Sequence, residues 1–254
     1  MAAAGRVRYP LHVDGETAEV GDAEELAVVL DVLNGRRDRD VLAQLRPHLP
    51  RIIRRPADLP LLIRALAPDD QIFLIEAMGD SLADALQTAR HLRELLATIA
   101  EPNVKLSLID TLDGQGLRKL IVTARDLSGA LEWTYAQCSL RLLELLGDDY
   151  LRRLIRHGDD LAFALNALAE ESQSALLTSI GWARVAELTR NARDLALLLR
   201  AVPPSISVTL LDQYDRRQLV EIIGDRRAWT YLYNRIKADE AVQLLRKLGA
   251  DDAL

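Results

Sequence analysis

The chain repeats itself every 34 residues, and this period limits the possible folds more strongly than any single motif does. Pairs of adjacent apolar residues mark the period: Leu74-Ile75, Leu108-Ile109, Leu142-Leu143, Leu176-Leu177, Leu210-Leu211 and Leu244-Leu245. Proline follows the same register, with Pro68 and Pro102 one period apart and Pro204 three periods later. A compact helical bundle does not require apolar pairs and prolines to recur in register, so the period predicts a tandem-repeat architecture.

Within one repeat the apolar residues have helical spacing, and small or acidic residues interrupt it. Gly147 and its equivalents, such as Asp113 and Gly181, separate a first helix from a second. A second break falls near the middle of several repeats, for example at Gly158. Each repeat is therefore predicted to contain either three short helices or two helices of which the second is often broken. The segment 184–202 contains no such breaker, which predicts a continuous second helix there.

A single repeat cannot bury its apolar stripe, whereas stacked repeats share one continuous core. We therefore predict an all-α fold, a right-handed-type α-solenoid of about six 34-residue helical repeats. The predicted repeats occupy residues 40–254 and start near residues 40, 74, 108, 142, 176 and 210, with a partial repeat from residue 244.

Residues 1–39 do not follow the period and are predicted to form a cap over the first repeat. Two short runs with strand propensity flank Asp14-Gly15, which is a strong signal for a β-hairpin. Asp22 followed by Glu25 is typical of a helix start, and Asn34-Gly35 is typical of a helix end. The prediction is a β-hairpin followed by a helix that covers the otherwise exposed end of the stack.

Two known repeat families resemble parts of the chain. Leu146-Gly147, Tyr150 and Phe163 match part of the tetratricopeptide motif, although Asp160, Arg193 and Arg227 or their neighbours replace the small residues of its second helix. Ile52-Ile53-Arg54-Arg55-Pro56, followed by Leu59 and Leu61-Leu62, is similar to the repeats of the mitochondrial transcription termination factors. The chain thus resembles a generic α-solenoid of the broad tetratricopeptide/HEAT type.

Composition and motifs argue against several classes of function. The formal net charge of −6 disfavours a general binder of nucleic acid or anionic membranes. No apolar run approaches the roughly 20 residues of a membrane-spanning helix. The single cysteine, Cys138, and four scattered histidines do not match a metal site, and the glycine-rich phosphate-binding loops do not occur. We therefore expect no enzymatic activity, no cofactor, no metal and a cytoplasmic location, with secretion as an effector as the alternative.

One polar column and one aromatic residue are the candidate binding residues. Arg90, Arg125, Arg193 and Arg227 occupy equivalent or one-residue-shifted positions before the last helix of their repeats. Because equivalent positions in stacked repeats face the same way, these arginines are predicted to line one edge of the solenoid. They either grip an acidic or phosphate-bearing partner or pair with acidic residues of the next repeat, and the second interpretation is favoured. Trp182 is the best candidate for an exposed contact residue.

These features predict a non-enzymatic scaffold that binds another protein, as a helix or an extended peptide, on the solenoid surface. A nucleic-acid-binding repeat protein is the first alternative, motivated by the arginine column and by eight arginines within residues 34–64. The chain's net charge disfavours this alternative. A helical module of a secreted bacterial effector is the second alternative.

Overall fold

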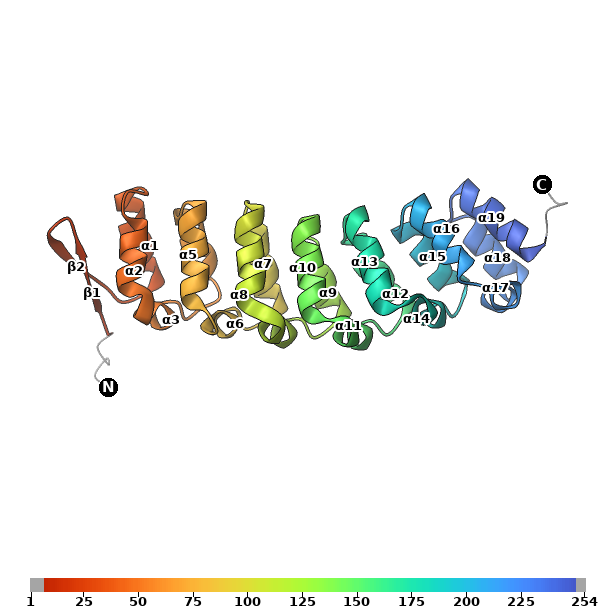
Figure 1. Ribbon diagram of the computed structural model, residues 1–254, viewed down its shortest axis with the longest axis horizontal. Coiled ribbons are helices and arrows are strands. Elements are labelled where there is room, and N and C mark those ends of the chain that lie inside the picture. The colour runs from red at the N-terminus through yellow and green to blue at the C-terminus, as the bar shows by residue number, and fades with distance from the viewer. Residues whose placement is uncertain (1–6, 250–254) are drawn as a thin grey trace. The chain divides into compact units, whose positions relative to one another are not determined.

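The structure is a computed structural model that describes residues 7–249, and these form two compact units, one on each side of the Ile121–Val122 bond. Both units are built from repeats of three helices, which we call A, B and C (Figure 1). The alternative of three short helices per repeat is therefore the one that the structure adopts. The A helices from residue 68 onwards begin 34 residues apart, at positions 68, 102, 136, 170, 204 and 238.

The helices of each class have the following bounds. The A helices are α2 (Asp38–Leu45), α5 (Pro68–Met78), the first part of α8 (Pro102–Leu120), α10 (Ala136–Leu146), α13 (Glu170–Ile180), α16 (Pro204–Asp212) and α19 (Ala238–Leu248). The B helices are α3 (Leu49–Ile52), preceded by the 3-10 turn η1 (Arg46–His48), then α6 (Ser81–Leu86), the second part of α8, α11 (Asp148–Leu154), α14 (Trp182–Leu188) and α17 (Arg216–Ile223). The C helices are α1 (Ala23–Leu33), α4 (Asp58–Ala65), α7 (Ala89–Thr98), α9 (Ala124–Leu131), α12 (Gly158–Asn166), α15 (Ala192–Ala201) and α18 (Arg226–Tyr233).

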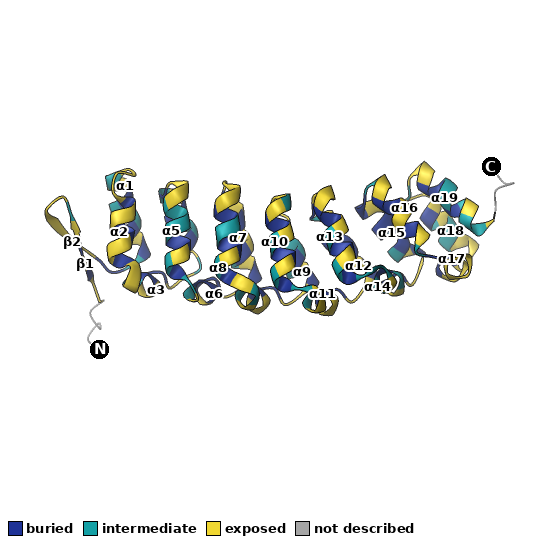
Figure 2. Ribbon diagram, in the orientation of Figure 1, coloured by how far each residue is buried: buried dark blue, intermediate teal, exposed yellow. Residues whose placement is uncertain are grey.

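Helices of the same class pack on each other within each unit. In the first unit α2 contacts α5 and α5 contacts α8, while α1 contacts α4 and α4 contacts α7. In the second unit α9, α12, α15 and α18 contact one another in chain order, and α10 contacts α13. The A helices thus form one layer of each unit and the C helices the other. Most apolar residues of both layers are buried, and the helices of each layer also carry exposed residues (Figure 2).

A residue with positive φ joins the A helix to the B helix in four successive repeats. It is Gly79 (φ 47°), Asp113 (φ 52°), Gly147 (φ 76°) and Gly181 (φ 87°). Glycine adopts this conformation without a steric penalty, whereas a Cβ atom makes it unfavourable. This requirement explains why the position between the A and B helices contains glycine in most of these repeats. Asp113 occupies the same position in one repeat and is therefore in a strained conformation.

The predicted continuous helix over 184–202 is wrong, because α14 ends at Leu188 and α15 begins at Ala192. The side chain of Asn191 accepts hydrogen bonds from the backbone amides of Arg193 and Asp194. These two bonds stabilise the start of the new helix. The buried hydroxyl of Thr189 accepts from Tyr214 Oη at 2.6 Å. Burial raises the pKa of Tyr214 to about 12, so the phenol stays protonated and able to donate.

The C helices α12 and α15 are in close contact where they begin. At Gly158 in α12, an added Cβ atom would lie 2.9 Å from Asp194 Cβ and 3.1 Å from the Leu188 carbonyl oxygen. The equivalent residues of the neighbouring helices, Ala124 and Ala192, are also small and buried. Small side chains at this position therefore allow α12 and α15 to pack in contact.

Buried polar side chains bind carbonyl groups that the helix ends leave without a donor. Gln173 Nε2 donates to the carbonyls of Leu165 at 2.9 Å and Ala201 at 3.0 Å, which connects α13 to the ends of two successive C helices. Gln71, three periods earlier, donates to the carbonyl of Ile63 in the same way. An unpaired buried carbonyl is costly, so these bonds stabilise the connection between one repeat and the next.

The predicted β-hairpin is present at the N-terminal end of the first unit. Strand β1 (Tyr9–Val13) pairs antiparallel with β2 (Glu16–Val20), and both residues of the turn, Asp14 and Gly15, have positive φ. One edge of β1 bonds to Gln44, whose side chain both accepts from and donates to the His12 backbone. The role of residues 1–39 as a separate cap stays a prediction, as does the end of the repeat region at residue 254. Residues 1–6 and 250–254 of those two ranges lie outside the described residues.

Replacing Gly158 with Ala should destabilise the fold by about 1–3 kcal/mol, because the new methyl group overlaps Asp194 and a backbone carbonyl. Urea unfolding measures the change. The matched control is Gly116→Ala in α8, where the nearest atoms lie at 3.4 Å or more and the added methyl fits. This control should be neutral or stabilising by up to about 1 kcal/mol. Equal behaviour of the two variants would contradict the close helix contact.

Replacing Asp113 with Gly should stabilise the fold by about 1 kcal/mol. Strain from a non-glycine residue in this conformation costs about 1–3 kcal/mol. The Asp113 side chain does accept from the amides of Gln115 and Gly116, but glycine at such a capping position loses only a few tenths of a kcal/mol. Gly147→Val should show the opposite sign in the same thermal-unfolding measurement. A lower melting temperature for Asp113→Gly would show that the cap outweighs the strain.

Candidate functional site

Each C helix from α4 to α18 presents three positions on one face, at i, i+4 and i+7, so that the C helices of each unit carry three rows. The first row contains Ala57, Arg90, Arg125, Asp159, Arg193 and Arg227. The middle row contains Leu61, Glu94, Gly129, Phe163, Leu197 and Tyr231. The last row contains Arg64, Ala97, Glu132, Asn166, Arg200 and Asn234. None of these row positions is buried, whereas most of the apolar residues between them are.

All four predicted arginines belong to the first row. Arg90 lies on α7 in the first unit, and its guanidinium pairs with Glu94 at 2.9 Å in an exposed contact. Arg125, Arg193 and Arg227 lie on α9, α15 and α18 in the second unit and are exposed. Within residues 7–249 their side chains make no ion pair. The favoured interpretation, in which the arginines pair with acids of the next repeat, thus has no supporting contact at these three residues.

The acids near these arginines bind backbone amides instead. Asp126 accepts from the amide of Thr123 at 2.9 Å, and Asp160 accepts from that of His157 at 3.1 Å. Asp194 accepts from the amide of Arg190, also at 3.1 Å. Each carboxylate thereby stabilises the turn between a B helix and a C helix. Only one oxygen of each carboxylate is used in this way, and among residues 7–249 these three acids form no ion pair with the arginines of the first row.

Charge is distributed unequally between the two layers of the second unit. Its A helices carry three basic and six acidic side chains, whereas its C helices carry five basic and four acidic ones. Three of the four acids on the C helices are the amide-binding residues Asp126, Asp160 and Asp194. The formal net charge of the whole chain therefore conceals a face on which the available charges are mainly arginine.

The middle and last rows are functional candidates that the sequence analysis missed. Phe163 on α12 is 60% exposed, although an aromatic ring of this size is usually buried. Tyr231 lies at the same position of α18, two periods later, with Arg235 stacked over its ring. The 34-residue period contains the signal that could have found them, because each row is one column of the repeat alignment.

Concave surfaces occur beside the rows in both units. In the first unit a groove of about 880 Å³ is lined by residues of α4 and α7, including the row residues Leu61, Arg64 and Glu94. In the second unit a cavity of about 330 Å³ lies where α12 and α15 begin, and the row residues Asp159 and Arg193 line it. Row residues therefore border a recess in each unit.

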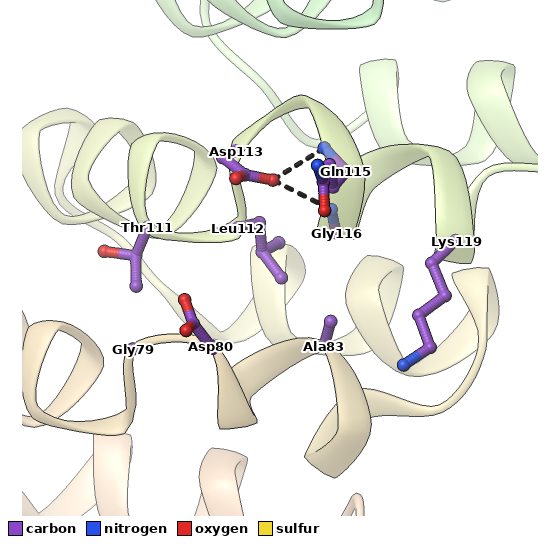
Figure 3. Close-up of a pocket in the computed structure, with 9 residues that line it drawn as sticks. All are labelled: Gly79, Asp80, Ala83, Thr111, Leu112, Asp113, Gln115, Gly116 and Lys119. Carbon is purple, nitrogen blue, oxygen red and sulfur yellow. Dashed lines mark hydrogen bonds between the residues drawn. The ribbon is translucent and has the colours of Figure 1, made fainter.

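Another cavity of the first unit lies away from the rows, between α6 and the kink of α8 (Figure 3). It has a volume of about 230 Å³, and Asp80, Asp113 and Lys119 supply its charged lining. Asp113 bonds to amides of its own helix, and Lys119 pairs with Asp84. These internal contacts involve two of its three charged side chains, so this cavity is not the preferred candidate.

The other residues that the sequence singled out lie elsewhere. Trp182 begins α14, a B helix, is half-buried and does not belong to the C-helix face. Cys138, the single cysteine of the sequence, is buried in α10. Residues 7–249 contain no group of three or more His, Cys, Asp or Glu side chains that could hold a metal ion. No helix in the same range combines the length and the apolar character needed to cross a membrane.

No protein-family model matches the chain, and no curated protein matches its sequence. Among solved structures, the chain is similar to the crystal structure of PUF-8 in complex with PBE-RNA, with 10% sequence identity and a TM-score of 0.53. The similarity covers 87% of this chain and 72% of that chain. At this identity the likeness concerns the fold alone. It shows that the chain is a PUF-like, all-α helical-repeat solenoid with a small N-terminal β-hairpin.

This finding corrects the predicted function. The fold prediction is confirmed, and the broad tetratricopeptide/HEAT resemblance is replaced by a likeness to a PUF protein. The predicted protein-binding scaffold, with a partner helix or peptide as ligand and nucleic acid disfavoured, is contradicted because the similar solved structure is an RNA complex. The physical reason for the error is the use of net charge, which counts the amide-binding acids and the acids of the A helices equally with the exposed arginines.

Proposed function

We propose that this chain is a non-enzymatic RNA-binding protein that holds single-stranded RNA against the exposed face of its C helices. The observation that carries the proposal is the first row of the second unit, where Arg125, Arg193 and Arg227 are exposed and without an ion pair among the described residues. The likeness to PUF-8, a protein solved in complex with RNA, supports it.

Arginine at these positions suits a phosphate ligand. Its guanidinium is always charged and donates two parallel hydrogen bonds that match the oxygens of a phosphate group. Three arginines on the helices of one layer give three contacts along one strand. Because the first row lies near the amino ends of the C helices, the partial positive charge of each helix end acts in the same direction.

The middle row suits unpaired bases. Phe163 offers an exposed ring in the same set of rows as the arginines. Tyr231 lies in the same row two periods later with one ring face covered by Arg235, and Leu197 on α15 lies between them. Bases stack on such side chains only when they are not paired within a duplex, and stacking contributes about 1–3 kcal/mol per base. Rings beside a row of arginines are therefore more consistent with single-stranded than with double-stranded RNA.

Replacing Arg125, Arg193 and Arg227 together with Glu should abolish RNA binding and leave the helical content and melting temperature nearly unchanged, because exposed charges contribute little to stability. Fluorescence anisotropy with a labelled single-stranded RNA of random sequence measures the binding. The corresponding triple Ala variant should reduce the slope of log affinity against log salt by about two, which corresponds to three lost phosphate contacts.

The matched control replaces three exposed arginines outside the C helices, Arg216, Arg217 and Arg246, with Glu. This control makes the same change in net charge and should lose much less affinity than the first variant. Equal losses in the two variants would show that RNA responds only to total charge. Absence of RNA binding by the unmodified protein at low salt would refute the proposed function.

A further inference from the structure

One recess of the second unit carries charges of both signs. It has a volume of about 330 Å³ and lies where α12 and α15 begin. Asp159 lines it from α12, Arg193 lines it from α15, and Arg190 lines it from the turn before α15. All three side chains are exposed, and none of them forms an ion pair among residues 7–249. These opposite charges therefore share one cavity without pairing within the protein.

Other polar groups of the recess are bound to the turn that separates α14 from α15. Asn191 Nδ2 donates to Asp194 at 3.0 Å, and the half-buried Asp194 also accepts from the amide of Arg190 at 3.1 Å. One oxygen of Asp159 accepts from the amide of Asp160 at 3.1 Å, and its second oxygen has no hydrogen bond within the described residues. The exposed charged groups that the recess offers are thus two guanidinium groups and this second oxygen.

This set of groups suits one ribose-phosphate unit of an RNA strand. Guanidinium groups bind phosphate oxygens with two parallel hydrogen bonds. A carboxylate repels a phosphate but accepts a hydrogen bond from a hydroxyl group. In RNA the 2′-hydroxyl is attached to the carbon next to the one that carries the 3′-phosphate, so a single nucleotide supplies the anion and the donor side by side. DNA keeps the phosphate and lacks the hydroxyl.

We propose, on the basis of the RNA-binding function above, that this recess distinguishes RNA from DNA by binding one ribose-phosphate unit. Arg190 and Arg193 bind the phosphate, and Asp159 accepts a hydrogen bond from the neighbouring 2′-hydroxyl. Among the four C helices described in the second unit, α12 alone carries a carboxylate in the first row, so the selection acts at one point of the strand. The contact is to the sugar and is independent of the base.

The test measures fluorescence anisotropy with 12-nucleotide strands of uridine, 2′-fluoro-uridine and deoxyuridine. All three strands carry the same base and the same phosphates. The fluoro strand keeps the sugar conformation of RNA but cannot donate a hydrogen bond from the 2′ position. The uridine strand should bind at least about threefold more tightly than the other two, because they lack one hydrogen bond to a charged group. Equal affinity for all three strands would overturn the inference and leave single-strand binding by the arginines intact.

Replacing Asp159 with Ala removes the acceptor, so the ratio of the affinities for the uridine and fluoro strands should fall to about one. The matched control is Asp148→Ala, which makes the same charge change at an exposed residue of the B helix α11 and should keep the ratio. A ratio that survives in Asp159→Ala would refute the role of the carboxylate.

Replacing Arg190 with Ala tests the phosphate contact. This variant should weaken binding of all three strands and reduce the slope of log affinity against log salt by about 0.7, which corresponds to one lost phosphate contact. An unchanged slope would contradict the placement of a phosphate in this recess. If the unmodified protein binds none of the strands at low salt, the proposed function fails and this inference fails with it.

Discussion

Within each unit, the repeats bury their apolar side chains against neighbouring repeats, and the two helix layers depend on this contact. Leu142, Leu176 and Leu210 occupy equivalent positions in three successive A helices, and each is at most 1% exposed. No single repeat has a partner surface of its own for these residues. Because helices of the same class stack on one another within each unit, equivalent surface positions form rows.

The turns between B and C helices contribute both to this register and to the proposed binding face. At these turns a carboxylate, such as that of Asp160 or Asp194, binds backbone amides and stabilises the start of the next C helix. Among residues 7–249 these carboxylates form no ion pair with the exposed arginines of the first row. The net charge of −6 therefore does not describe the charge distribution on the C-helix face.

Variation within a row changes the chemistry of the surface from one C helix to the next. Arg125, Arg193 and Arg227 are alike and suit the repeating phosphates of a strand. Asp159 differs, because it places a negative charge in the same row.

Local pattern alone was enough to predict the repeat, its period, the β-hairpin and the helix breaks at residues such as Gly147, because these depend on backbone preferences and on the spacing of apolar residues. It also placed the four arginines in one column. Which acids bind backbone amides, and which arginines lack an ion pair, became visible only in the folded chain. The separation of α14 from α15 likewise involves the Asn191 cap and the buried Thr189–Tyr214 bond. Such outcomes depend on side-chain geometry and on contacts between residues distant in the chain, so charge counted along the sequence does not show which charges are available on the surface.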